Sequence, residues 1–206
     1  MPIHVWAWAL LAGAVGIVAL VIALTLLNQL VALPQQQISE LRALPPVTAI
    51  TLLLAAAPIA GVVEEAAFRG YMQGPIERQN GLLVAILITG TMFAVAHLDF
   101  TLVLWPYYVA VAAIYGTVTY LTKSILPAVV LHTGGNIYSN LDLWFHGQAE
   151  WQAIAAPAAR LWEAGPTLYL WEMIGALLAL TSIALWAFGR LATAGRARAD
   201  NGGFSV

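Results

Sequence analysis

Long apolar runs, separated by short polar or proline-containing stretches, make up nearly all of this 206-residue chain. Only 9% of the residues are charged and 61% are hydrophobic, whereas a soluble domain has about 25% charged residues. A helix of about 20 apolar residues crosses the hydrocarbon core of a bilayer, and there every backbone polar group must be bonded within the protein. The sequence therefore predicts an integral membrane protein.

The apolar runs predict one all-α domain over residues 1–206, a polytopic transmembrane helical bundle of about six spans. The expected spans are Val5–Val31, Val47–Met72, Leu82–Leu98, Leu102–Thr122, Ile125–Phe145 and Thr167–Phe188. The polar stretches 34–46 and 146–166 read as loops or short interfacial helices. The first run has no basic segment before it and is too long for a signal-peptide core, so we expect it to be retained. Lysines and arginines in the short loops favour cytoplasmic termini, and the small Ala-rich chain suggests a bacterial inner membrane.

The composition also excludes several kinds of site. The formal net charge is −2 and no Lys/Arg-rich run interrupts the apolar stretches, so we expect no nucleic-acid partner. Cysteine is absent, which excludes disulfides, thiolate nucleophiles and Cys-ligated metals. The serines lack a G-x-S-x-G context, and Asp99 and Asp142 lie near predicted span ends, so serine and aspartyl mechanisms are disfavoured. A single G-x-x-x-G pair, Gly70 and Gly74, leaves the oligomeric state open.

Polar and ionisable residues inside the apolar spans are the candidate functional residues. An ionisable side chain at bilayer depth costs at least ~2.5–3.5 kcal/mol, so it persists only where it faces a protein interior or a cavity. The candidates are Glu64, Glu65 and Arg69 in the second predicted span, His97 in the third, and His132 and Asn136 in the fifth. The i, i+4 spacing places Glu65 with Arg69, and His132 with Asn136, on one helix face. We expect both pairs to point into one shared cavity.

This set of side chains suits water-mediated hydrolysis of an acyl bond. A buried Arg69 can neutralise one carboxylate and leave the other free to act as a base. Glu64 or Glu65 could then activate water, while imidazole and amide N–H groups stabilise an oxyanion. Each residue alone also fits an interhelical hydrogen bond, a structural ion pair or the proton relay of a transporter. A transporter is further expected to have inverted repeats, which the chain lacks.

Three motifs follow one another in the middle of the chain. They are Glu64-Glu65-x-x-x-Arg69, Phe93-x-x-x-His97 and His132-x-x-x-Asn136. This order resembles the CPBP family of CAAX-type proteases and bacteriocin-processing or immunity proteins, which are glutamic-type intramembrane proteases. The resemblance covers a motif-bearing core of about residues 57–140, while the first and last spans carry no motif.

The resemblance implies an intramembrane endopeptidase that cleaves a membrane-associated protein or peptide. Glu64 and His97 would activate water, His132 and Asn136 would form the oxyanion hole, and Glu65 and Arg69 would support them. No cofactor is needed in this mechanism. One alternative makes Glu64, His97 and His132 the three ligands of a catalytic zinc, although the lack of an H-E-x-x-H helix favours the metal-free mechanism. Another alternative is a non-catalytic bacteriocin-immunity or scaffold protein, which the intact motifs disfavour.

Straight antiparallel spans would hold Glu64 and His97 apart. At 1.5 Å per residue, Glu64 lies roughly 25 Å from the outer end of its span and His97 roughly 24 Å from the inner end of the next. Pro58 and Gly61, just before the glutamates, would permit a kink. We therefore expect a bent second span that brings Glu64 within reach of His97 through one water.

Overall fold

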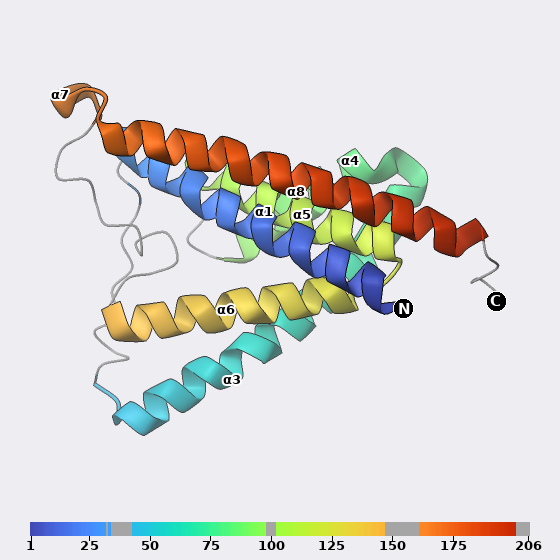
Figure 1. The fold of residues 1–206 in the computed structure, drawn as a ribbon. Coiled ribbons are helices and arrows are strands. Elements are labelled where there is room, and N and C mark those ends of the chain that lie inside the picture. Colours follow the sequence, from blue (N-terminus) through green and yellow to red (C-terminus); the bar gives the residue numbers. More distant parts are fainter. Residues whose placement is uncertain (32, 34–42, 98–101, 147–160, 201–206) are drawn as a thin grey trace.

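The computed structural model describes residues 1–31, 33, 43–97, 102–146 and 161–200, and all regular secondary structure in these residues is helical (Figure 1). The elements are α1 (Ile3–Leu30), α3 (Pro46–Glu65), η1 (Ala66–Gln73), α4 (Gly74–Ala96), α5 (Trp105–Thr122), α6 (Leu126–His146), α7 (Leu161–Ala164) and α8 (Leu168–Asp200). The predicted all-α class is confirmed, and each predicted span has a long helix at its position. The expected loops at 34–42 and 147–160 lie outside the described residues.

Three described segments are long and apolar enough to cross a membrane: Ile3–Leu30, Pro46–Ala96 and Leu168–Arg196. The middle segment holds two of the predicted spans in succession, because α3, η1 and α4 follow one another without a loop. Apolar side chains such as Ile59 on α3 and Leu185 on α8 are more than 60% exposed, as expected of surfaces that face lipid. The chain is an integral membrane protein.

The most extensive helix contacts are those of α1 with α8, α3 with α6, and α4 with α5. In Figure 1, α1, α5 and α8 run side by side, and α3 and α6 form a second pair next to them. The start of α1 and the end of α8 lie at the same end of the bundle. The larger buried cluster joins α1, α4, α5 and α6 and is rich in aromatic side chains, including Phe93, Tyr108 and Tyr115. The candidate site borders this cluster.

The second predicted span changes its helix type after the residues at which the sequence suggested a kink. The α-helix α3 continues through Pro58 and Gly61, and a kink of its axis there stays a prediction. Gly61 allows α6 to approach, since a Cβ at this position would overlap the hydroxyl of Thr133. The helix widens into the π-helix η1 directly after Glu65, and it breaks at Gly81, whose φ is 82°. The change in helix geometry therefore follows the glutamates.

Local sequence accounts for both irregularities. Pro75 has no N–H to donate to the residue four positions before it, so a regular α-helical ladder is interrupted next to η1. Gly81 can adopt a positive φ because it has no Cβ to clash with the backbone. A π-helix inside a longer helix is rare and is frequent at functional sites. Here it carries the buried face that includes Arg69 and Gln73.

Candidate active site

The end of α3 and the π-helix η1 bury three polar side chains on one face. Glu65 is 0% exposed, Arg69 3% and Gln73 1%. Arg69 Nη1 donates to Glu65 Oε1 at 2.7 Å, which is the contact that the i, i+4 spacing predicts. Gln73 Nε2 donates to the carbonyl oxygen of Gly116 at 3.0 Å. The first contact balances a buried charge, and the second ties η1 to α5.

Aromatic rings enclose the Arg69 guanidinium. Its central carbon lies 5.1 Å from the ring centroid of Phe93, 5.3 Å from that of Tyr115 and 5.9 Å from that of Phe68. A cation over an aromatic face is attracted by the ring quadrupole, and the attraction strengthens where water is excluded. The rings therefore compensate part of the cost of burying the guanidinium, in addition to the Glu65 carboxylate.

His132 is held from three sides. Its Nδ1 lies 2.8 Å from Glu65 Oε1, the same oxygen that accepts from Arg69. Because an ionised carboxylate can only accept, Nδ1 carries the hydrogen. The other ring nitrogen, Nε2, lies 3.8 Å from Glu64 Oε2. The ring of Tyr115 stacks on the imidazole with centroids 5.2 Å apart and planes 19° apart. Both the orientation and the tautomer of a neutral His132 follow from these contacts.

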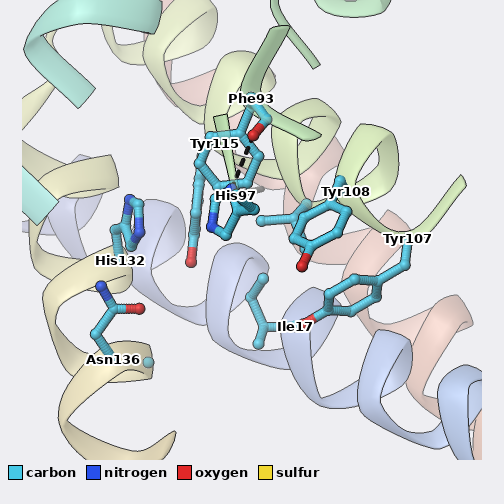
Figure 2. Close-up of a pocket in the computed structure, with 10 residues that line it drawn as sticks. Ile17, Phe93, His97, Tyr107, Tyr108, Tyr115, His132 and Asn136 are labelled. Carbon is cyan, nitrogen blue, oxygen red and sulfur yellow. Dashed lines mark hydrogen bonds between the residues drawn. The ribbon is translucent and has the colours of Figure 1, made fainter. Parts of the chain in front are cut away.

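His97 directly follows the end of α4. Its Nδ1 lies 2.8 Å from the carbonyl oxygen of Phe93, the contact drawn as a dashed line in Figure 2. A carbonyl only accepts, so Nδ1 is the donor and a neutral imidazole presents Nε2 as its acceptor. The rings of Phe93 and Tyr108 pack against His97 with centroids 4.5 and 4.7 Å away. The F-x-x-x-H motif thus places the phenylalanine carbonyl so that it selects the histidine tautomer.

A small cavity lies between α6 and α5 and is lined by His97, His132 and Asn136 together with aromatic side chains (Figure 2). His132 and Asn136 project from successive turns of α6, and His97 reaches the cavity from the end of α4. Its volume is about 30 Å³, which exceeds the roughly 10–15 Å³ that one water molecule needs. The cavity can therefore hold a reacting water next to the two imidazoles and the amide.

The predicted site residues divide into three groups. His97, His132 and Asn136 line the cavity. Glu64 lies beside it, with a side chain that is 30% exposed and an oxygen 3.8 Å from His132. Glu65 and Arg69 do not line the cavity, and the Arg69 guanidinium lies among aromatic rings. The expectation of one shared cavity therefore holds for the α6 pair alone. A water-mediated approach of Glu64 to His97 stays a prediction.

Sequence reasoning missed six lining residues, which are Ile17, Tyr107, Tyr108, Val111, Tyr115 and Gly135. Ile17 comes from the first span, which carries no motif. The tyrosines did give a signal, because Tyr108 and Tyr115 are seven residues apart in an otherwise apolar span and so share one helix face. Hydroxyl-bearing rings on a single face of such a span indicate a polar cavity on that side.

The spacing of the His, Asp and Glu side chains does not match a preformed zinc site among the described residues. Among the residues that the structure describes, no three His, Asp or Glu side chains lie close enough together to hold a metal ion. His132 already directs Nδ1 to Glu65, which leaves Nε2 as its ligating atom. A zinc site at Glu64, His97 and His132 would therefore require these side chains to move closer together.

One family model matches the chain: the Rce1-like family of type II CAAX prenyl endopeptidases matches residues 46–138. This range begins with α3 and ends within α6, and it contains all three motifs. No curated protein and no solved structure matches the chain. The resemblance to CAAX-type proteases is confirmed. Residues 46–138, and with them all six predicted site residues, are similar to the Rce1-like family of type II CAAX prenyl endopeptidases.

Proposed function

We propose that this protein is an intramembrane endopeptidase that hydrolyses a peptide bond in a membrane-associated protein or peptide. The observation that carries the proposal is the convergence of His97, His132 and Asn136 on one small cavity beside Glu64. The family match supports a protease with a membrane-associated substrate.

Glu64 and His97 activate the attacking water. Glu64 is the less buried of the two carboxylates and, within the described part of the chain, forms no salt bridge with an arginine, so it is the one available to accept a proton. His97 directs Nδ1–H to Phe93 and offers Nε2 as a second acceptor for the same water. General-base catalysis of this kind contributes roughly 10²–10⁴-fold to the rate. The abstracted proton then passes to the leaving amine as the tetrahedral intermediate collapses.

His132 and Asn136 stabilise the oxyanion. The Asn136 amide is a donor in any protonation state. His132 donates through Nε2 only as an imidazolium, because Nδ1–H already faces Glu65. That cation would lie next to the carboxylates of Glu65 and Glu64, at 2.8 and 3.8 Å. A preorganised oxyanion donor contributes roughly 3–4 kcal/mol to transition-state stabilisation.

Glu65 and Arg69 are positioning residues. Neither lines the cavity, so neither is expected to touch the substrate. Glu65 fixes the ring of His132, and Arg69 fixes Glu65 through the same carboxylate oxygen. Their effect on the reaction passes through His132.

We further propose a bacterial inner-membrane location with both termini in the cytoplasm. Lys123 follows α5, and the carbonyl oxygen of Leu121 near that end of α5 faces Gly195 on α8. Lys123, Arg190 and Arg196 therefore lie at the end of the bundle where α1 begins. An excess of lysine and arginine marks the cytoplasmic side of a membrane protein.

The test is proteolysis in liposomes that contain the purified full-length protein and a library of membrane-anchored, internally quenched peptides. We expect cleavage by the wild type, a loss of at least roughly 100-fold for Glu64→Gln, and wild-type rates for Glu172→Gln, which removes an exposed carboxylate on α8. Cleavage is expected to survive chelation. Loss on chelation with recovery on zinc addition would instead favour zinc ligation by Glu64, His97 and His132. Cleavage of no peptide, with normal cellular behaviour of Glu64→Gln, would favour the immunity or scaffold alternative.

A further inference from the structure

A second and larger cleft lies on the far side of the buried Arg69 side chain from the catalytic cavity. Its volume is about 270 Å³, and its walls include Arg69, Gln73, Glu77, Thr119, Lys123 and Ser124. It shares no lining residue with the catalytic cavity. Along α5, Lys123 lies roughly 12 Å beyond Tyr115, the last α5 residue that lines the catalytic cavity. The cleft is therefore a separate site, and the proposed hydrolysis gives it no role.

The cleft lies at one end of the helical bundle. Its outer wall is the turn that joins α5 to α6, at Lys123, Ser124 and Ile125. This turn is at the end of the bundle that also carries Arg190 and Arg196 on α8. With the proposed topology this end faces the cytoplasm and the lipid headgroups of that leaflet, and pockets between helices on the cytoplasmic side can bind headgroups.

Lys123 and Glu77 line the cleft from different helices, and within the described residues they form no salt bridge with each other. Arg69, the other charged lining residue, is paired with Glu65. Lys123 has a left-handed backbone, with φ 53°, and its ammonium lies 4.1 Å from the centroid of the Tyr120 ring. Glu77 projects from α4, where its carboxylate accepts a long, 3.4 Å hydrogen bond from Gln73. A ligand with one anionic and one cationic group would complement both side chains.

We propose that this cleft binds the headgroup of a zwitterionic aminophospholipid, with the phosphate at Lys123 and Ser124 and the ammonium at Glu77. The volume is close to the lower end of the range for small-molecule sites, roughly 300 Å³, which suits a headgroup whose acyl chains stay in the bilayer. Gly70 and Gly74 leave the wall formed by η1 and α4 open, since a Cβ on either would meet nothing closer than 3.5 Å. The G-x-x-x-G pair thus lines a cleft.

Occupancy of the cleft would also brace the catalytic network. The headgroup would contact η1, α4 and α5 at once, next to the hydrogen bond between Gln73 and Gly116. One turn before Gln73, Arg69 holds Glu65, which in turn orients His132. A bound headgroup would therefore add contacts between η1 and α5 beside the hydrogen bond of Gln73 with Gly116.

The test measures binding directly and needs no proteolytic activity. Delipidated full-length protein is titrated with phosphatidylethanolamine, phosphatidylcholine or phosphatidylglycerol in detergent, and bound lipid is counted by native mass spectrometry. Lys123→Asn removes the charge but tolerates the left-handed backbone, and we expect it to weaken phosphatidylethanolamine binding roughly fivefold. Glu77→Gln should abolish the preference for phosphatidylethanolamine over phosphatidylglycerol. Arg196→Gln, which removes an exposed charge outside the cleft, should bind as the wild type does.

A further variant fills the cleft without changing its charge. Gly70→Leu should exclude the headgroup while the purified protein keeps its helical content, as measured by circular dichroism. Unchanged lipid binding by Gly70→Leu or Lys123→Asn would overturn the proposal. So would an equal loss in Arg196→Gln, which would indicate general surface charge. Thermal protection of the delipidated protein by inorganic phosphate as strong as that by phosphatidylethanolamine would assign the cleft to a free anion and not to a lipid.

Discussion

Glu65 and His132, 67 positions apart in the sequence, are joined by a 2.8 Å hydrogen bond in the interior of the bundle. The bond links the end of α3 to α6, and Arg69 donates to the same carboxylate oxygen from η1. Glu65, although it is adjacent to Glu64 in the sequence, therefore has a separate role. It orients the histidine that we assign to the oxyanion hole, while Glu64 remains available to activate water.

Replacing Glu65 should lower both the stability of the fold and the rate of peptide hydrolysis. Glu65→Gln leaves the buried Arg69 guanidinium without a counter-charge, and breaking a buried ion pair from one side costs roughly 3–5 kcal/mol. Equilibrium unfolding of the purified protein in detergent measures the loss. The double variant Glu65→Gln/Arg69→Met removes both charges, so its loss should be smaller than the sum of the two single losses. Additive losses would show that the two side chains do not interact.

Packing between α3 and α6 should be sensitive at Gly61. Gly61→Val places methyl groups against Thr133, and overpacking of this kind costs roughly 1–3 kcal/mol. Because the same helix pair holds Glu64 and Glu65 against His132, activity should fall together with the midpoint of thermal unfolding. Gly175→Ala on α8 is the matched control, since a Cβ there has no neighbour within 4 Å. Normal stability and activity in Gly61→Val would contradict this packing.

Two asparagines on α6 are expected to have different roles, with Asn136 in catalysis and Asn140 in stability. Asn136 lines the catalytic cavity, whereas Asn140, one turn later, donates to the carbonyl oxygen of Leu53 at 2.8 Å. Asn136→Ala should lower kcat roughly 10²–10³-fold with little change in KM, because an oxyanion donor acts mainly in the transition state. Asn140→Ala should lower thermal stability and leave kcat near that of the wild type. The assignment fails if Asn136→Ala raises KM alone.

The ring of Tyr115 should matter more than its hydroxyl group. It stacks on His132 and contacts the Arg69 guanidinium, so it supports both members of the Glu65 network. Tyr115→Phe keeps these contacts and is expected to retain most activity, whereas Tyr115→Leu removes the aromatic face. The measurement compares the steady-state cleavage rates of the two variants. Equal rates would show that the stacking of Tyr115 on His132 is not needed for activity.

The sequence predicted the helices well because apolar length and loop charge report directly on membrane spans. It also predicted the contact of Glu65 with Arg69, since i, i+4 residues share a face whatever surrounds the helix. Both predictions depend on local periodicity alone.

What the sequence could not predict depends on neighbours from other helices. Pro58 suggested a kink, yet α3 continues through it as an α-helix, and the irregular segments come later, in η1 and at Gly81. Arg69 was expected to face the cavity, but rings from η1, α4 and α5 enclose it. Ile17 lines the cavity only because α1 packs against α5 and α6. None of these three features can be predicted from the sequence of a single span.

The most direct test of the account is a double-variant cycle at Glu64 and His97, with cleavage rates measured in metal-free proteoliposomes. If the two residues activate one water, Glu64→Gln and His97→Gln should each lose at least roughly 100-fold, and the double variant should lose little more than the worse single variant. Losses that multiply in the double variant, or a near-normal rate in either single variant, would contradict a shared role in activating water.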